Sequence, residues 1–97
     1  MSTPSTILDS HRQLIRLVVE SHRARNPRVF GSVLGRRDSA DSDLDLLVDT
    51  LADTTLFDLG ALQVELEACL GVPVDVLTPG DLPDHFRERV LAEAEPV

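Results

Sequence analysis

Residues 31–45 read GSVLGRRDSADSDLD, and the interpretation of the whole chain starts from them. The stretch opens with Gly31-Ser32 directly after an apolar pair, and it closes with Asp43 and Asp45 at the start of a second apolar run. Side chains two positions apart on a strand lie on one face, roughly 6–7 Å apart. The pattern therefore predicts a strand whose two carboxylates point the same way while its leucines face a core.

Two carboxylates held side by side on a rigid strand repel each other unless a cation lies between them. Mg²⁺ prefers oxygen ligands, usually takes one or two carboxylates, and completes its shell with water and substrate phosphate. The pair therefore predicts a magnesium site for phosphoryl or nucleotidyl transfer. Because 17 of the 97 residues are acidic, an isolated Asp-x-Asp is more often a solvated edge or a turn, and this alternative has to be weighed against the rest of the pattern.

The composition is that of a small globular domain. We expect one domain over residues 1–97, with its core between about residues 7 and 94, and 42% of the residues are apolar. The net charge of −8 argues against direct binding of nucleic acid, which usually requires a basic face. No apolar run is long enough to cross a membrane, and the first residues lack the core of a signal peptide. A single cysteine, Cys69, allows no internal disulfide, so we expect a cytoplasmic protein.

Apolar periodicity and turn residues predict an order of helix, strand, turn, strand, helix, strand and helix. Ser5 is the expected N-cap of the first helix, and Thr55 with Asp58 resembles a capping box for the second, which Gly71 is placed to end. Cys69 is expected in the core. We expect helices at residues 5–24, from the capping box to residue 70, and at 82–94, the last with Phe86, Val90 and Leu91 facing inward. The predicted strands are 28–30, 42–49 and 72–77. Residues 33–42 are expected to form a short helical turn and a loop.

The third predicted strand, VPVDVL, carries a further carboxylate, Asp75. Its side chain lies on the face opposite Val72, Val74 and Val76. The strand, helix and strand from Asp43 onward favour a right-handed crossover with parallel pairing. The pairing of the two strands that flank residues 33–42 stays open at this stage.

The combination of Gly-Ser, ten residues, Asp-x-Asp and a later strand with one Asp resembles the DNA polymerase β-like nucleotidyltransferase superfamily. More narrowly, the phrases VFGSVLGRRDSADSDLDLLVD, TLFDLGALQVELEACLGVPVDVLTP and FRERVLAEA are similar to the minimal nucleotidyltransferases, which are often antitoxins encoded beside a HEPN-domain toxin. The resemblance implies an α/β (α+β) fold with a short mixed β-sheet and helices packed against it.

The same resemblance implies a role for each matching residue. Gly31 and Ser32 would hold the β- and γ-phosphates of the nucleotide. Asp43 and Asp45 would bind metal ions, and Asp75 would bind one metal and the attacking oxygen. The implied cofactor is a pair of Mg²⁺ ions, with ATP as substrate.

Arg36 and Arg37 follow the Gly-Ser pair in the same loop. A guanidinium makes charge-assisted hydrogen bonds to phosphate oxygens, so either residue is a candidate nucleotide contact. A solvated loop position is an equally good interpretation of both.

The resemblance implies that AMP passes from ATP to a hydroxyl, by family pattern a tyrosine of a HEPN-type RNase toxin, which the modification silences. The chain contains no tyrosine, so it is not its own tyrosine acceptor. One alternative is a catalytically silent antitoxin that neutralises the toxin by binding alone. Another is transfer to a small molecule by a homodimer, although the sequence indicates no acceptor pocket.

Overall fold

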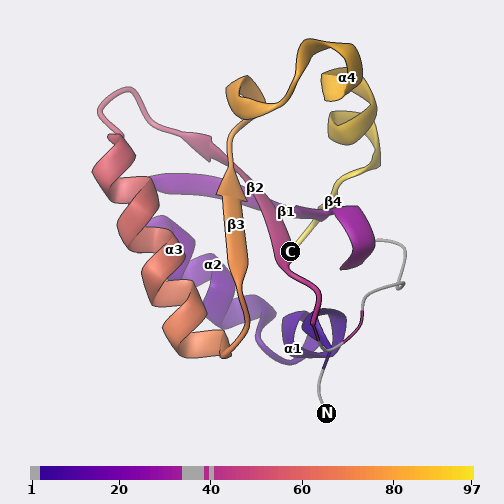
Figure 1. Ribbon diagram of the computed structural model, residues 1–97. Coiled ribbons are helices and arrows are strands. Elements are labelled where there is room, and N and C mark those ends of the chain that lie inside the picture. Colours follow the sequence, from indigo (N-terminus) through magenta and orange to yellow (C-terminus); the bar gives the residue numbers. More distant parts are fainter. Residues whose placement is uncertain (1–2, 34–38, 40) are drawn as a thin grey trace.

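A computed structural model describes residues 3–33, 39 and 41–97, apart from the side chain of Ser32 (Figure 1). These residues form four α-helices, four strands and two single turns of 3₁₀ helix. None of the described helices is long and apolar enough to cross a membrane. In chain order the elements are α1 (Pro4–Ser10), α2 (Arg12–Ser21), β1 (Ala24–Phe30), η1 (Gly31–Val33), β2 (Leu44–Thr50), α3 (Leu56–Leu70), β3 (Val74–Leu77), η2 (Pro79–Asp81), α4 (Asp84–Glu93) and β4 (Glu95–Pro96).

The strands form one mixed sheet in the order β3-β2-β1-β4. β2 and β3 pair in parallel, and α3 makes the crossover between them, as predicted. β1 runs antiparallel to β2 and to β4, which answers the question that the sequence left open. The predicted α+β class with a short mixed sheet is confirmed.

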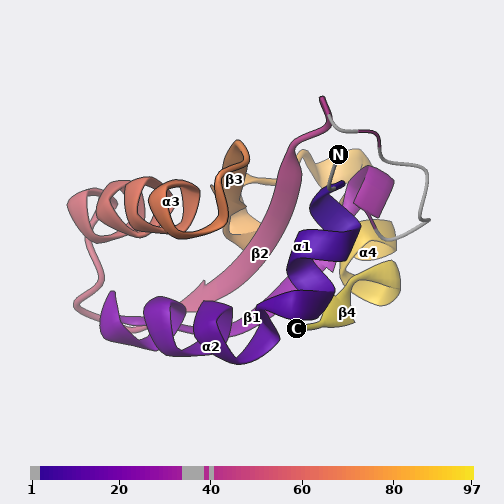
Figure 2. The same ribbon diagram turned by 90° about the horizontal axis from the view of Figure 1, so that it is seen from below.

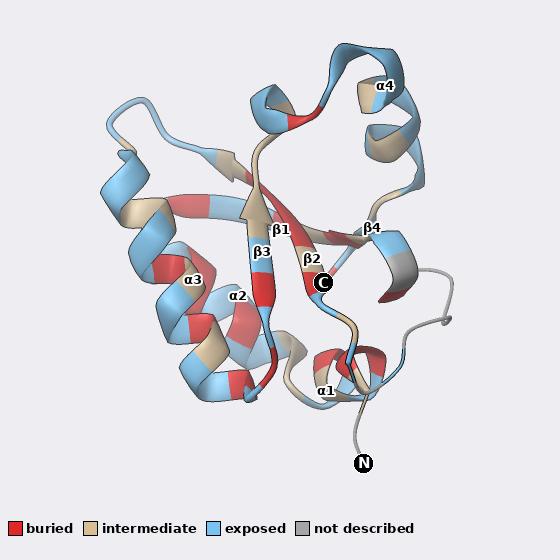
Figure 3. Ribbon diagram, viewed as in Figure 1, coloured by how far each residue is buried: buried red, intermediate tan, exposed pale blue. Residues whose placement is uncertain are grey.

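The core lies between one face of this sheet and the first three helices, with α2 against β1 and α3 against β3 (Figure 2). Leu44, Leu46 and Val48 of β2 are fully buried in it, which confirms the predicted alternation along this strand. Leu47, from the opposite face of β2, is buried outside that cluster. Figure 3 shows the buried positions turned inward along α2 and α3. The second face of the sheet is partly covered, at Leu47, and carries Asp45 and Asp75 near the start of β2 and β3.

Both ends of α3 have the predicted chemistry. The Thr55 hydroxyl accepts from the Asp58 N–H while the Asp58 carboxylate accepts from the Thr55 N–H, which is a complete capping box. Gly71 ends the helix in the left-handed conformation, with φ of 71°. The helix that connects the two carboxylate-bearing strands is therefore fixed at both ends by local sequence.

The predicted single first helix is wrong, because the chain breaks at His11 into α1 and α2. The Ser10 hydroxyl donates to the Thr6 carbonyl, and His11 Nδ1 lies 2.8 Å from the Ile7 carbonyl oxygen. Polar side chains that occupy carbonyls in this way compete with continued helix bonding. The N-cap is also not Ser5: the hydroxyl of Thr3 accepts from the Thr6 N–H.

The first strand begins at Ala24, four residues earlier than predicted. Asn26 adopts a left-handed conformation with φ of 55°, and the register with β2 shifts between Arg25 and Arg28. A bulge of this kind accommodates Pro27, which cannot donate to a regular ladder. The short strand β4 was not predicted, since two residues carry no periodic signal.

Three residues in the C-terminal half that were predicted to be buried are exposed. Cys69 is exposed and not in the core. Phe86 and Leu91 are both more than one-third exposed, and α4 has no buried residue. The helix stands beyond the end of β3 instead of lying on the main core, so its apolar residues are only partly covered (Figure 1).

The glycine inside α3 allows a direct stability test. Gly60 is exposed, and a Cβ there would meet nothing within 4 Å. Glycine loses more backbone conformational entropy than alanine when a helix forms. We therefore expect Gly60→Ala to raise the free energy of unfolding by about 0.5–1 kcal/mol. Urea denaturation followed by circular dichroism measures the change.

The neighbouring position gives the matched control, since Ala61 is also exposed in the same helix. Ala61→Gly should lower the free energy of unfolding by about the same amount. A loss of stability in Gly60→Ala would mean that the space beside Gly60 is filled in solution.

Candidate active site

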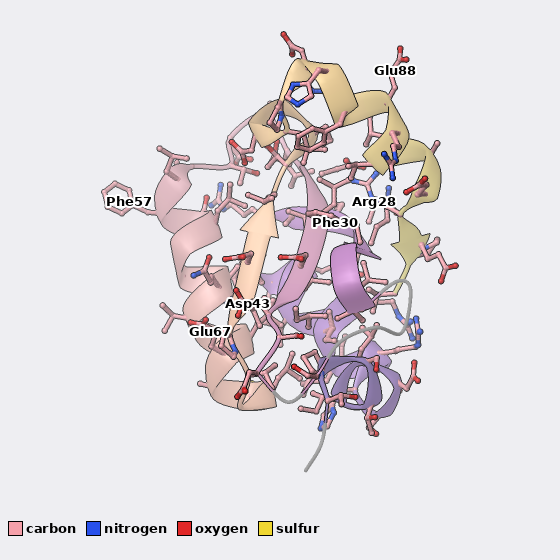
Figure 4. All side chains as sticks on the ribbon, turned by 45° about the vertical axis from the view of Figure 1, so that its right-hand side comes forward. Arg28, Phe30, Asp43, Phe57, Glu67 and Glu88 are labelled. Atoms are coloured by element: carbon pink, nitrogen blue, oxygen red, sulfur yellow. The ribbon has the colours of Figure 1, made fainter. Side chains whose placement is uncertain are left out.

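The parallel register of β2 and β3 brings two distant carboxylates together. Leu44 is opposite Val74, and Asp45 is directly opposite Asp75. Alternation along both strands sends the valine and leucine into the core and the two aspartates to the other face. Asp43 lies just before β2 and is exposed (Figure 4). The three predicted carboxylates therefore lie around the start of the β2–β3 ladder.

Gly31 lies against the same group, at the point where β1 passes into η1. Its predecessor Phe30 pairs with Asp45 in the β1–β2 ladder. Gly31 has φ of 78°, and a Cβ at this position would overlap the Oδ2 atom of Asp45. Glycine is therefore required here for two reasons: a left-handed backbone and room for the carboxylate. The family resemblance implied only that Gly31 helps to hold the phosphates of the nucleotide.

The surroundings of Asp45 make its negative charge costly. Partial burial, the charge of Asp75, a hydrogen bond to the Asp75 side chain and the charge of Asp43 raise the pKa of Asp45 to about 6, burial being the largest cause. No cationic side chain among the described residues offsets these effects. The described part of the site is therefore an acidic cluster without a compensating positive charge.

Asp49, four residues further along β2, shows what compensation looks like. Asn26 Nδ2 donates to Asp49 Oδ2 at 3.0 Å, and Arg28 Nη2 donates to Oδ1 at 2.8 Å. These contacts, that of Asn26 first, lower the pKa of Asp49 below its ordinary value. Arg28 is thus engaged with Asp49, and no cationic side chain among the described residues lowers the pKa of Asp45 in the same way.

The donor set fits a magnesium ion with an incomplete protein shell. Within the described ranges, no three His, Cys, Asp or Glu side chains converge closely enough to enclose an ion by themselves. Mg²⁺ is usually held by one or two carboxylates, with the other positions taken by water and substrate phosphates. Asp45 beside Asp75, with Asp43 adjacent, offers oxygen ligands of that kind and an excess of negative charge that no described side chain neutralises. The chemistry of the site favours a hard cation that is shared with a phosphorylated substrate.

A residue that the sequence did not single out positions the third strand. Glu67, in the last turn of α3, accepts a hydrogen bond from the Val74 N–H through Oε2 at 3.0 Å. Val74 immediately precedes Asp75, so the contact ties the start of β3 to the helix. The available signal was weak, namely one acidic residue in an otherwise apolar helical turn.

Three of the predicted nucleotide contacts are not tested by this geometry. Arg36 and Arg37 lie outside the described residues, as does the side chain of Ser32. The backbone of Ser32 lies in η1, next to Gly31. Their assignment as nucleotide contacts remains a prediction.

Comparison with known proteins places the chain among nucleotidyltransferases. Residues 12–97 match the nucleotidyltransferase domain family. The protein adenylyltransferase MntA of Thermococcus cleftensis is 34% identical over 88 residues, which cover 91% of this chain and 86% of that protein.

Two solved structures have the same fold. One, described as a minimal nucleotidyltransferase, is 41% identical, with a TM-score of 0.84 and coverage of 93% of this chain and 92% of that chain. The other, a toxin–antitoxin with AMP-PNP, is 16% identical, with a TM-score of 0.72 and coverage of 89% and 70%. The chain therefore belongs to the nucleotidyltransferase domain family and is an enzyme of the minimal nucleotidyltransferase type.

Proposed function

We propose that this domain transfers AMP from ATP, with Mg²⁺, to a hydroxyl of a partner toxin and so acts as its antitoxin in the cytoplasm. The proposed acceptor is a tyrosine of a HEPN-type RNase. The observation that carries the proposal is the direct pairing of Asp45 with Asp75 in a site with no cation of its own among the described residues. A bound Mg²⁺ ion would offset the repulsion between these carboxylates and connect them to the triphosphate of the substrate.

In the proposed reaction the acceptor hydroxyl oxygen bonds to the α-phosphorus of ATP, the bond between that phosphorus and the bridging oxygen to the β-phosphate breaks, and pyrophosphate leaves. Bound Mg²⁺, as two ions, would stabilise the negative charge on the attacking and leaving oxygens. Asp43 and Asp45 would hold the ions. Asp75, exposed on the edge strand, would bind one of the ions and the attacking hydroxyl, whose proton it would receive.

The residues around Gly31 would hold the rest of the nucleotide. Gly31 and Ser32 would face the β- and γ-phosphates, and Arg36 and Arg37 are the proposed charge-assisted contacts to phosphate oxygens. Because Gly31 has no side chain, the backbone approaches Asp45 closely, and phosphate bound here would lie beside the metal ligands.

The proposed protein acceptor is supported by the relatives and by the composition. MntA of Thermococcus cleftensis is named a protein adenylyltransferase, and a structural neighbour is a toxin–antitoxin with AMP-PNP. The chain has no tyrosine, so a tyrosine acceptor has to come from another molecule. A partner protein supplies it most simply.

The test is transfer of α-labelled ATP, with Mg²⁺, to a HEPN-type protein encoded beside this domain. Wild type should label the partner, and Asp43→Asn/Asp45→Asn should reduce labelling by at least about a hundredfold, since metal ligands are lost. Asp53→Asn is the matched control, because Asp53 is an exposed aspartate that pairs with Arg23 away from the β2–β3 ladder.

Two results would contradict the proposal. If neither wild type nor the double variant labels the partner while both bind it tightly, the domain is a silent antitoxin that acts by binding. If wild type neither labels nor binds the HEPN-type protein, that class of partner is wrong.

A further inference from the structure

The side of α3 that faces away from the core is apolar along its whole length. At about 100° per residue, positions 57, 60, 61, 64 and 68 lie opposite the buried Leu62 and Leu66. Phe57 is 89% exposed and Val64 68% exposed, and Phe57 points out into solvent in Figure 4. We call this surface the α3 ridge; it consists of Phe57, Gly60, Ala61, Val64 and Ala68.

A solvent-facing helix surface usually carries charged and polar residues. Single exposed apolar side chains are ordinary, but a continuous stripe indicates an interaction site. Figure 3 shows this side of α3 as exposed over most of its length. Within the part of the chain that the structure describes, the ridge belongs to no core cluster.

Gly60 is a second, independent indication. It sits in the middle of the ridge, where glycine weakens a helix by about 0.5–1 kcal/mol relative to alanine. A Cβ there would meet nothing within 4 Å, so the fold itself gains nothing from the missing side chain. Glycine and alanine between larger residues leave a low point at which a second helix can approach closely. The cost to the helix is explained if another backbone packs there.

Charge restricts what packs on the ridge. The three ionisable carboxylates of α3, Asp58, Glu65 and Glu67, border the ridge on both sides, and the helix contains no arginine or lysine. A second copy of this chain would set these carboxylates against each other, at a net charge of −8 per chain. An apolar helix with basic flanks would instead meet opposite charge at both borders.

We propose that the α3 ridge is the docking site for a partner protein that presents an apolar helix flanked by arginine or lysine. The proposal rests on the proposed function only for the identity of the partner as the acceptor of AMP. α3 packs on β3, the strand that carries Asp75, so the ridge and Asp75 belong to neighbouring elements at one edge of the sheet.

The test uses a synthetic amphipathic helical peptide with a leucine face, arginine flanks and one tryptophan. The domain contains no tryptophan, so fluorescence reports the peptide alone. We expect wild type to bind this peptide at least about tenfold more tightly than a twin with glutamate in place of arginine. Phe57→Glu/Val64→Glu should weaken binding at least about tenfold, although it makes the domain more acidic and so favours non-specific attraction.

Two further variants separate docking from folding and from general charge. Gly60→Leu fills the low point of the ridge with a good helix former, so it should weaken peptide binding without lowering the unfolding midpoint. Gln13→Glu/Leu17→Glu adds the same two charges to exposed positions of α2 and should leave binding unchanged.

Equal binding by wild type and Phe57→Glu/Val64→Glu, or no binding by wild type, would overturn the proposal. Self-association of wild type that the same double variant abolishes, measured by sedimentation equilibrium, would assign the ridge to a second copy instead. Asp43→Asn/Asp45→Asn should bind the peptide as wild type does, and the ridge variants should keep the thermal shift caused by ATP and Mg²⁺. A failure of the transfer chemistry is therefore distinguishable from a failure of docking.

Discussion

Asp45→Asn is expected to lose at least about a hundredfold in transfer rate and yet to be more stable than wild type at pH 7 without metal. The two effects have one cause. Asp45 is held beside Asp75 and near Asp43, so its negative charge is unfavourable until a cation arrives. Asparagine removes both the repulsion and the metal ligand. Transfer of labelled AMP and chemical denaturation in EDTA measure the two effects separately.

The stability effect has a defined pH dependence. The pKa of Asp45 is raised from 3.8 to about 6, so the folded state binds the proton more tightly than the unfolded state. Wild-type stability therefore falls as pH rises from about 4 to about 6, and the full cost is present above that range. A shift of about two units corresponds to roughly 3 kcal/mol, which solvent screening of this half-exposed group reduces to about 1–2 kcal/mol. The advantage of Asp45→Asn should vanish below about pH 4.

Asp49→Asn is the matched control on the same strand. Its pKa is lowered by the hydrogen bond from Asn26 and by Arg28, so its charge stabilises the fold. Asp49→Asn should therefore lose stability at pH 7, opposite in sign to Asp45→Asn. If Asp45→Asn is instead the less stable of the two, the carboxylate is not under repulsion in solution.

Gly31→Ala is expected to reduce transfer about as strongly as Asp45→Asn, although it removes no functional group. A methyl group at this position overlaps the Asp45 carboxylate oxygen, and φ of 78° is unfavourable for alanine. The backbone penalty alone is about 1–2 kcal/mol. The carboxylate has to move out of the pairing with Asp75, so metal affinity should fall together with stability. Transfer assays, Mg²⁺ titration and urea denaturation report the three changes.

Gly71→Ala separates the two causes. Gly71 has nearly the same backbone angle, φ of 71°, but a Cβ there would meet nothing within 4 Å. It should therefore lose a similar amount of stability to left-handed strain while keeping its transfer activity. Equal loss of activity in the two variants would show that strain, and not displacement of Asp45, impairs the enzyme.

The carboxylate strands were predictable because their signals are local and redundant. Alternating leucines and valines define the faces of β2 and β3, and a capping box and a C-terminal glycine define the helix between them. The parallel crossover follows from this order. The sequence also predicted which three aspartates share the polar face. Their metal-binding role remains a prediction.

Features that depend on competition or on long-range contacts were not predictable. The break at His11 reflects side-chain bonding to carbonyls, which a periodic apolar stripe conceals. The bulge at Asn26 allows a strand to include Pro27, against the usual preference. Cys69 matched the apolar stripe of α3 although it lies toward the exposed side. The helix carries apolar residues on both its buried and its exposed side, so the sequence pattern alone does not reveal which side faces the core.

The alternation of β3 has a consequence for mutational drift. Val74 is buried in the core, while Asp75 faces its partner carboxylate on the other side. If β3 slipped by one residue against β2, Asp75 would enter the apolar layer and the valines would turn to water. The hydrophobic pattern that folds this edge strand thus also fixes the register that places Asp75 opposite Asp45. Sequence changes that keep this apolar pattern therefore also keep Asp75 opposite Asp45.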